Sequence, residues 1–178
     1  MLSSSTWTSD NDDPRSVEMV EARGTISRDG ELCTARFERV LAHPPGVVWE
    51  ALTSSAALER WMLPASIEPR VGGEASFDVG EGPVSGRVTI WEPPRALGYE
   101  WPFPDDRSGH VSWTLEPSED GRATRLVLEH TGLPPDWASG YGSGWHAYLD
   151  RLASHLGGHK PEDWAERVAA LRPAYERS

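Results

Sequence analysis

Cysteine is nearly missing from this sequence: Cys33 is the single cysteine among 178 residues, so no internal disulfide can form. Cys33 has no CxxC partner, and the six histidines are scattered rather than placed at a spacing that binds metal. A GxSxG motif is also absent, and no GK[ST] follows the glycines of "SGYGSG", which rules out a phosphate loop there. These absences predict a cytoplasmic protein with neither a metal site nor a cofactor.

Basic residues are scarce as well. Seventeen lysines and arginines face 28 aspartates and glutamates, which gives a net charge of −11. Nucleic acids and anionic membranes need lysine and arginine to meet their phosphates, so we expect neither as a partner. No apolar run approaches the roughly 18 residues of a membrane span, and the N-terminal segment lacks the apolar core of a secretory signal. The length fits a single domain, as a monomer or a homodimer.

The order of the predicted elements points to an α+β domain. Residues 1–16 are polar and rich in turn formers, which predicts a disordered tail. Two strands follow around the turn signal Asp29-Gly30. Pro44 and Pro45 suit the first turn of a helix, and a second short helix is expected through Trp61. Six further strands, divided by turns, are predicted at residues 66–71, 74–80, 83–92, 95–101, 110–117 and 124–132.

Alternation of apolar residues in three of these strands marks one face of an antiparallel sheet. Side chains two residues apart share a face, so one face of the sheet is expected to lie in the core. The residues expected to point inward are Leu97, Tyr99, Trp101, Val111, Trp113, Leu115, Leu126, Leu128 and His130.

A long amphipathic helix is predicted in the second half of residues 131–158, with Gly157-Gly158 at its end. Its apolar stripe consists of Tyr141, Trp145, Tyr148, Leu149, Leu152 and Leu156. Asp150, Arg151 and Ser154 lie opposite this stripe and are expected to face solvent. Residues 17–158 then form the main domain. Residues 159–178 predict a short helical extension that packs on it and is broken near Pro173.

Three glycines precede the best part of this helix, and each would cost about 1 kcal/mol relative to alanine inside a helix. Two interpretations stay open. Gly140 and Gly144, four residues apart, lie within the helix and let the backbone approach the sheet or leave space for a ligand. Alternatively, an irregular loop precedes a helix that starts near Ser143. Trp137, four residues before Tyr141, would line the same entrance.

Five segments resemble the START-like (SRPBCC) superfamily, and within it the branch of activators of heat-shock-protein ATPase, the Aha-type family. They recur in family order as "FERVLAHPPGVVWEALTSSAALERWM", "PRVGGEASFDV", "GRVTIWEPPRALGYEW", "VSWTLEPSEDGRATRLVLEHTGL" and "GWHAYLDRLASHLGG". The resemblance implies a helix-grip fold: a curved antiparallel sheet wrapped around a long C-terminal helix, with two short helices after the first core strand. It also implies an apolar cavity between sheet and helix. It says little about activity, because this superfamily includes carriers, cyclases, stress proteins and co-chaperone-like domains.

Three functions remain open, and the first is preferred: binding of a small hydrophobic or aromatic ligand in the internal cavity. The second is a cyclase- or hydratase-like enzyme that uses the same pocket, although we favour a protein that is not an enzyme. The third is a co-chaperone-like module that binds a protein partner. The expected ligand-binding residues are Trp61, Tyr99, Trp101, Trp113, Leu128, His130, Tyr141 and Trp145.

Histidines are the candidate acid–base groups. The inward position of His130 suits a residue that orients a ligand or moves a proton near neutral pH; Asp78 is the second choice. The alternative is a buried histidine bonded to a backbone carbonyl or a tryptophan N–H. His146 and Asp150, four residues apart on the long helix, are expected to form a surface contact.

Overall fold

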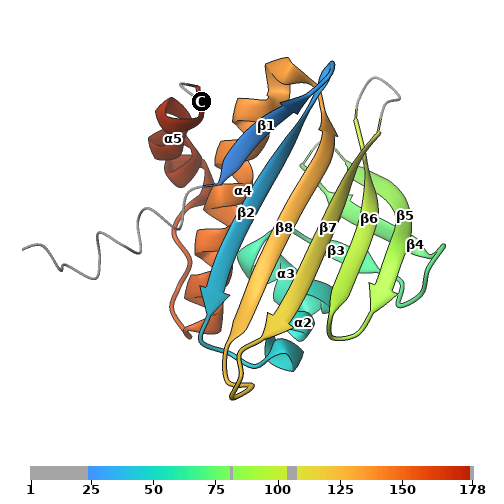
Figure 1. The fold of residues 1–178 in the computed structure, drawn as a ribbon, viewed down its shortest axis with the longest axis vertical. Helices are drawn as coiled ribbons and strands as arrows, with labels where there is room; N and C mark the ends of the chain where they lie inside the picture. The colour runs from blue at the N-terminus through green and yellow to red at the C-terminus, as the bar shows by residue number, and fades with distance from the viewer. Residues whose placement is uncertain (1–23, 81, 104–107, 177–178) are drawn as a thin grey trace, which may run out of the picture.

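The computed structural model describes residues 24–80, 82–103 and 108–176. Eight antiparallel strands form one curved sheet in the order β1-β2-β8-β7-β6-β5-β4-β3. Helices α2, α3 and α4 lie on one face of this sheet, and α5 lies on the outer side of α4 (Figure 1). The α+β helix-grip prediction is therefore confirmed. The predicted tail of residues 1–16 falls outside the described residues.

Most strand bounds lie within about three residues of the predicted ones. The strands are β1 Thr25–Asp29, β2 Leu32–Leu41, β3 Ala65–Ile67, β4 Glu74–Asp78, β5 Pro83–Glu92, β6 Ala96–Pro102, β7 Ser108–Pro117 and β8 Thr124–Leu133. Asp29 pairs with Leu32 at the end of the first hairpin, so the turn consists of Gly30 and Glu31. Gly30 has φ +62, a conformation that glycine adopts without strain.

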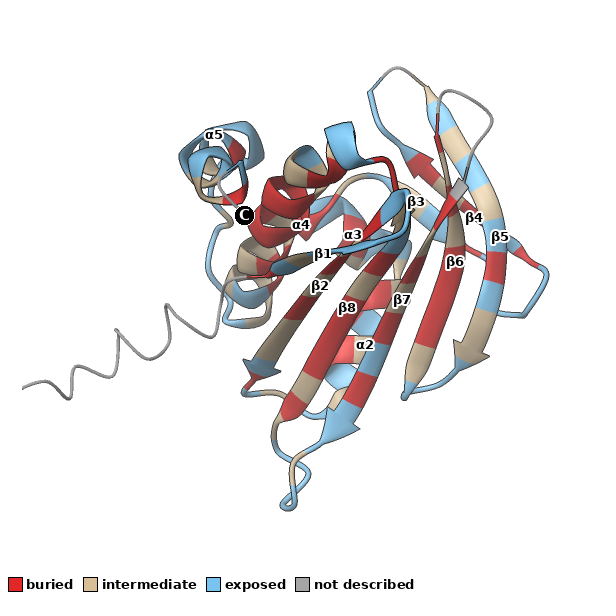
Figure 2. Ribbon diagram, turned by 45° about the horizontal axis from the view of Figure 1, so that its top comes forward, coloured by how far each residue is buried: buried red, intermediate tan, exposed pale blue. Residues whose placement is uncertain are grey.

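The register of the central strands brings the predicted inward residues into one layer. Trp113 of β7 lies opposite Leu97 of β6 and Leu128 of β8. Val111 likewise pairs with His130. Buried and more exposed residues alternate along β7 in Figure 2, as a period of two requires. The alternation predicted from the sequence is confirmed for these strands.

Both predicted short helices are present, as α2 Pro45–Thr53 and α3 Ser55–Trp61. Val48, Ala51 and Leu52 are the buried residues of α2. Trp61 is fully buried, and its indole N–H donates to the carbonyl oxygen of Ala51 at 2.8 Å. One side chain thus ties the end of α3 to α2, which holds the helix pair together under the sheet.

Helix α4 runs from Pro135 to Leu156 and contains all three glycines. The alternative of a loop before a helix that begins near Ser143 is therefore wrong. At Gly142 close packing explains why the helix keeps a glycine despite its low helix propensity. A Cβ there would lie 2.7 Å from the Tyr175 ring and 2.8 Å from Ile26 Cδ1. The missing side chain lets α5 and β1 approach the backbone of α4. Gly140 meets nothing within 4 Å and is exposed.

The face of α4 opposite the apolar stripe is covered by α5, which spans Trp164–Tyr175 and includes Pro173 in its last turn. Asp150 accepts from Arg167 of α5 at 2.8 Å, and Arg151 Nε donates to the Trp61 carbonyl at 2.7 Å. Arg151 Nη1 also donates to the Glu162 carbonyl. The expectation that Asp150 and Arg151 face solvent is wrong, because the C-terminal extension packs on them.

His146 is also buried, so the expectation that it meets Asp150 at the surface is wrong. Its Nδ1 lies 2.8 Å from the Tyr175 hydroxyl, and its Nε2 lies 3.7 Å from Asp150 Oδ1. Arg39 of β2 approaches the same carboxylate at 4.0 Å, and burial lowers the pKa of its guanidinium. A polar network therefore joins β2, α4 and α5. Across the described ranges, no helix is both long and apolar enough to span a membrane.

The position of Arg151 can be tested against its neighbour. Leu152→Ala should lower the free energy of unfolding by about 2–5 kcal/mol, because it leaves a cavity in the core. Arg151→Ala should cost about 1–2 kcal/mol, because the last carbonyls of α3 and that of Glu162 lose a charged donor. Arg95→Ala, on a side chain that is 75% exposed, should cost less than about 0.5 kcal/mol. Urea titrations measure all three, and equal values for Arg151→Ala and Arg95→Ala would contradict the assigned contacts.

The glycines of α4 give a second prediction. Gly140→Ala should raise the free energy of unfolding by up to about 1 kcal/mol, since the site is open and alanine favours the helix. Gly142→Ala gains the same propensity, but its Cβ collides with the Tyr175 ring, so we expect a net loss. Thermal melts of the two variants should shift in opposite directions. A stabilised Gly142→Ala variant would show that α5 does not need this close approach.

Candidate functional site

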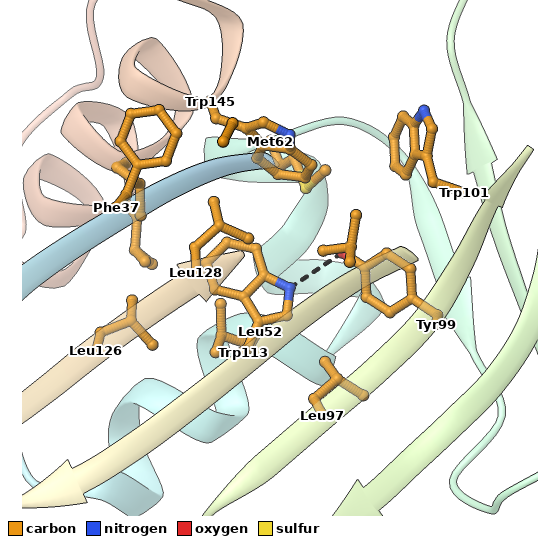
Figure 3. Close-up of a cluster of buried hydrophobic side chains, with 14 of the residues drawn as sticks. Phe37, Leu52, Met62, Leu97, Tyr99, Trp101, Trp113, Leu126, Leu128 and Trp145 are labelled. Carbon is orange, nitrogen blue, oxygen red and sulfur yellow. Dashed lines mark hydrogen bonds between the residues drawn. The ribbon is translucent and has the colours of Figure 1, made fainter. Parts of the chain in front are cut away.

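The inward-facing side chains of the sheet form a densely packed aromatic core (Figure 3). The indole N–H of Trp113 donates to the Tyr99 hydroxyl at 3.1 Å, and burial raises the pKa of that phenol. Figure 3 draws this hydrogen bond between β7 and β6. Trp61 meets Trp113 edge-on, with ring centroids 6.4 Å apart. The indole N–H of Trp113 and the hydroxyl of Tyr99 thus have a hydrogen-bond partner inside the core, as buried indole and phenol groups require.

His130 lies at the boundary between this core and the first turns of α4. Its side chain is fully buried, and its Nδ1 accepts a hydrogen bond from the Trp145 indole N–H at 2.9 Å. Of the two interpretations of His130, the structure therefore shows the buried histidine that is bonded to a tryptophan N–H. Because Nδ1 accepts, the neutral ring carries its proton on Nε2. Within the described residues, Nε2 has no hydrogen-bond partner.

Aromatic rings surround His130 on several sides. Phe103 stacks on it at a centroid distance of 6.0 Å, and the rings of Tyr141 and Trp101 meet it edge-on at 4.9 and 6.1 Å. A Cβ at Gly109 would lie 2.6 Å from Nε2, so glycine makes room for the imidazole. Burial, with a smaller contribution from His110, lowers the pKa of His130 to about 3. The ring is therefore neutral at physiological pH.

An open cleft of about 640 Å³ lies on the other side of these rings, along the N-terminal half of α4. Its walls come from the end of β4, from β6, from α4 and from α5. Its lining residues are Leu63, Asp78, Val79, Trp101, Asp136, Trp137, Ser139, Gly140, Tyr141, Gly144, Trp145, Tyr148, Trp164, Arg172 and Glu176. We call this space the aromatic cleft, because six of these side chains are tryptophans or tyrosines.

The structure divides the predicted ligand-binding residues into two groups. Trp101, Tyr141 and Trp145 line the aromatic cleft. The others are at most 2% exposed and belong to the packed core: Trp61, Tyr99, Trp113, Leu128 and His130. The open space therefore lies beside the expected internal cavity, nearer to the mouth of the grip.

Trp137, Gly140 and Gly144, which are expected at the entrance, also line the cleft. Other residues of the wall lie outside the predicted set. Tyr148 lies two helical turns after Tyr141, so the phase of α4 contained the signal for it. Trp164 comes from α5. No pattern in the sequence indicates that a residue so near the C-terminus closes this wall.

Most of the tryptophans that line the cleft donate their indole N–H to other protein atoms. Trp101 donates to the Tyr141 hydroxyl at 3.1 Å, and Trp164 donates to the Gly144 carbonyl at 3.3 Å. Trp145 is bonded to His130, as described above. Tyr148 stacks on Trp164 with ring centroids 5.3 Å apart, and burial raises its pKa to about 12. The rings are thus fixed in place, and the indole N–H groups of three of the four tryptophans are already hydrogen-bonded within the protein.

Charged groups stand around the aromatic cleft. Asp78 ends β4, Asp136 lies in the first turn of α4, and Glu176 follows α5. Arg172 is the single basic residue among the lining residues. In the part of the chain that the structure describes, no three histidine, cysteine or acidic residues gather closely enough to hold a metal ion.

The depressed pKa of His130 predicts a pH dependence of stability. The unfolded imidazole takes up a proton below about pH 6.5, whereas the folded one resists protonation until about pH 3. Its contribution is therefore present above pH 6.5 and lost towards pH 3, at up to about 1.4 kcal/mol per pH unit. In His130→Phe this loss is absent, so the stability difference from the parent should narrow as the solution is acidified. Chemical denaturation from pH 7 to 4 measures it.

The control for this experiment is His159→Gln, at an exposed histidine beyond α4. Its stability curve should run parallel to that of the parent over the same pH range. A constant difference between His130→Phe and the parent would show that His130 titrates normally and is therefore hydrated.

Comparison with known proteins supports the fold and names the family. A sequence model of the family "Activator of Hsp90 ATPase homolog 1-like protein" matches residues 42–157. Among curated proteins, no significant match is found.

Solved structures share the fold. CalU16 from Micromonospora echinospora is 24% identical, with a TM-score of 0.71 over 87% of this chain and 96% of that one. MLL2253 from Mesorhizobium loti is 30% identical, with a TM-score of 0.63 over 70% of this chain and 97% of that one. DynU16, from the dynemicin biosynthetic locus, is 27% identical, with a TM-score of 0.64 over 72% of this chain and 48% of that one.

The match of the family model extends over more than half of the chain, from the turn before α2 to the end of α4. It includes both short helices, six of the eight strands and the grip helix that carries the aromatic cleft. The chain therefore belongs to the activator of Hsp90 ATPase homolog 1-like family and, with it, to the START-like superfamily.

Proposed function

We propose that this protein binds a small apolar or aromatic molecule in the aromatic cleft. The observation that carries the proposal is the cleft itself: a space of about 640 Å³ with two tyrosines and four tryptophans in its wall. Ligand pockets typically have volumes of about 300–1,000 Å³ and are lined mainly by apolar and aromatic side chains. Apolar surface that a ligand covers here contributes roughly 25 cal/mol per Å² before the costs of association.

The rigidity of the wall supports the same proposal. Tyr141 is held by Trp101, and Trp164 is held by Gly144 and stacked on Tyr148. Rings that are fixed before the ligand arrives lose little conformational freedom on binding, so more of the contact energy appears as affinity. Gly140 leaves open space on the helix side of the cleft, because a Cβ there would meet nothing within 4 Å.

The occurrence of DynU16 in the dynemicin biosynthetic locus is consistent with a family member that handles a small organic molecule. It also favours the second candidate, a cyclase- or hydratase-like enzyme that works in the same cleft. For that function Asp78 is the better proton carrier, because it lines the cleft, whereas His130 is separated from it by Trp101 and Tyr141. A co-chaperone-like role would require a protein partner instead of a small ligand.

Filling the cleft tests the proposal. Gly140→Leu places an alkyl side chain where glycine leaves open space, and leucine is a good helix former. N-phenyl-1-naphthylamine, a neutral aromatic fluorophore, should bind the parent saturably, and the variant should bind it at least tenfold more weakly, a change of about 1.4 kcal/mol. Fluorescence titration gives both dissociation constants. Ala153→Leu adds the same side chain to an exposed site on α4 and serves as the control.

A parent protein that does not bind the fluorophore, or a Gly140→Leu variant that binds it as tightly as the parent, would refute binding in this cleft. Retained binding in Ala153→Leu with loss in Gly140→Leu would support it. For the enzymatic alternative, a ligand identified in this way can be incubated with the protein and followed by mass spectrometry for a change in mass or retention.

A further inference from the structure

We infer that the aromatic cleft selects ligands that carry a positively charged amine beside their aromatic part. This inference rests on the proposed function, because it specifies the chemical class of the ligand that enters the same cleft. It follows from two independent features of the wall, namely the faces of its rings and the balance of its charges.

The first feature is a wall in which three of the four indole donors are already hydrogen-bonded, so a ligand meets mainly the faces of the rings; Arg172 and several hydroxyl groups are the other donors that line the cleft. The indole N–H groups of Trp101, Trp145 and Trp164 donate to the Tyr141 hydroxyl, to His130 and to the Gly144 carbonyl. A ligand that offers an acceptor, such as a carboxylate, therefore finds none of these three donors available. Aromatic faces carry negative potential, and a cation held against tryptophan or tyrosine is attracted by about 0.5–2 kcal/mol.

The second feature is the charge around the opening. Asp78 and Asp136 come from two different elements, the end of β4 and the start of α4, and both line the cleft. Glu176 and Arg172 lie four residues apart at the end of α5, and Arg172 offsets one of the three acidic charges among the lining residues. The lining residues therefore carry a net charge of −2, from three carboxylates and one guanidinium. The net charge of −11 adds a long-range attraction for positively charged ligands.

These features should make a fatty acid or another anionic ligand bind more weakly than a neutral ligand of the same size. A carboxylate in the cleft would share it with two aspartates that line the same space, and like charges repel. An ammonium group on an aromatic body meets opposite charge and ring faces together. The matching ligand is thus an aromatic compound that carries an alkylammonium side chain.

Three probes of the same size separate the contributions: 1-naphthylmethylammonium, 1-naphthylmethanol and 1-naphthoate, which are cationic, neutral and anionic at pH 7. Isothermal titration calorimetry with the full chain gives the three dissociation constants. We expect the cation to bind at least about fivefold more tightly than the alcohol, and the alcohol more tightly than the anion. The ratio of the first two should fall between about 0.02 M and about 0.5 M salt, because screening weakens the ion contacts.

The variant Asp78→Asn/Asp136→Asn removes both charges and keeps the side-chain shapes, including the Asp78 oxygen that accepts from the Gly80 N–H. Its ratio of cation to alcohol affinity should fall well below that of the parent, towards the roughly two- to threefold of a weak cation–π contact of about 0.5 kcal/mol. Glu119→Gln removes an exposed charge from the β7–β8 turn, outside the cleft, and should keep the parent's ratio. Thermal melts confirm that each variant is folded.

The outcomes distinguish this inference from the function on which it rests. If all three probes bind equally, or the anion binds best, the charge selection is wrong while binding in the cleft stands. If none of the probes binds, the proposed function fails and the inference fails with it. A preference for the cation that persists in the double aspartate variant would show that Asp78 and Asp136 do not provide it.

Discussion

The hydrogen bond from Trp145 to His130 joins the grip helix to the middle of the sheet, and the arrangement around it depends on that contact. Trp145 comes from α4 and His130 from β8, so the bond fixes the distance and rotation of the helix relative to the sheet. Trp113 and Trp101 then pack against Trp145 with ring centroids 5.7 and 5.8 Å away. On one side of this cluster the side chains are packed densely; on the other side the cleft opens. The same contact thus sets the boundary between core and site.

The C-terminal extension changes what α4 has to do. A helix in a grip usually needs one apolar face, but here the opposite face is occupied as well, by a network that includes Asp150, Arg167 and His146. Gly142 allows the approach of Tyr175, whose hydroxyl accepts from the Gly24 N–H. A glycine-rich stretch that lowers helix propensity is therefore compensated by packing on two faces rather than one. Helix α5 lies outside residues 42–157, the part matched by the family model.

The sheet and the short helices could be predicted because their signals are local. Alternation in β6, β7 and β8 reflects the contrast between core and solvent, and prolines and glycines mark the turns. The start of α4 could not be predicted, since three glycines and an aromatic run are equally consistent with a loop until the packing of Tyr175 on Gly142 is known. How densely the inward side chains pack could not be predicted, for another reason. Inward orientation can be inferred from a pattern, but whether Trp61 and Leu128 fill the space completely depends on the summed volumes of all their neighbours.

Trp164 forms the outer wall of the cleft. It belongs to α5, which is not part of the sheet and is connected to α4 by residues 157–163. Such an element can detach while the eight-stranded sheet stays intact, because its opening breaks mainly side-chain contacts with α4. The cleft then has an opening free energy of its own, smaller than that of global unfolding. A ligand held between Trp164 and α4 would shift this local equilibrium towards the closed form. Amide exchange in α5 would then slow in its presence, while the exchange of the central strands stayed the same.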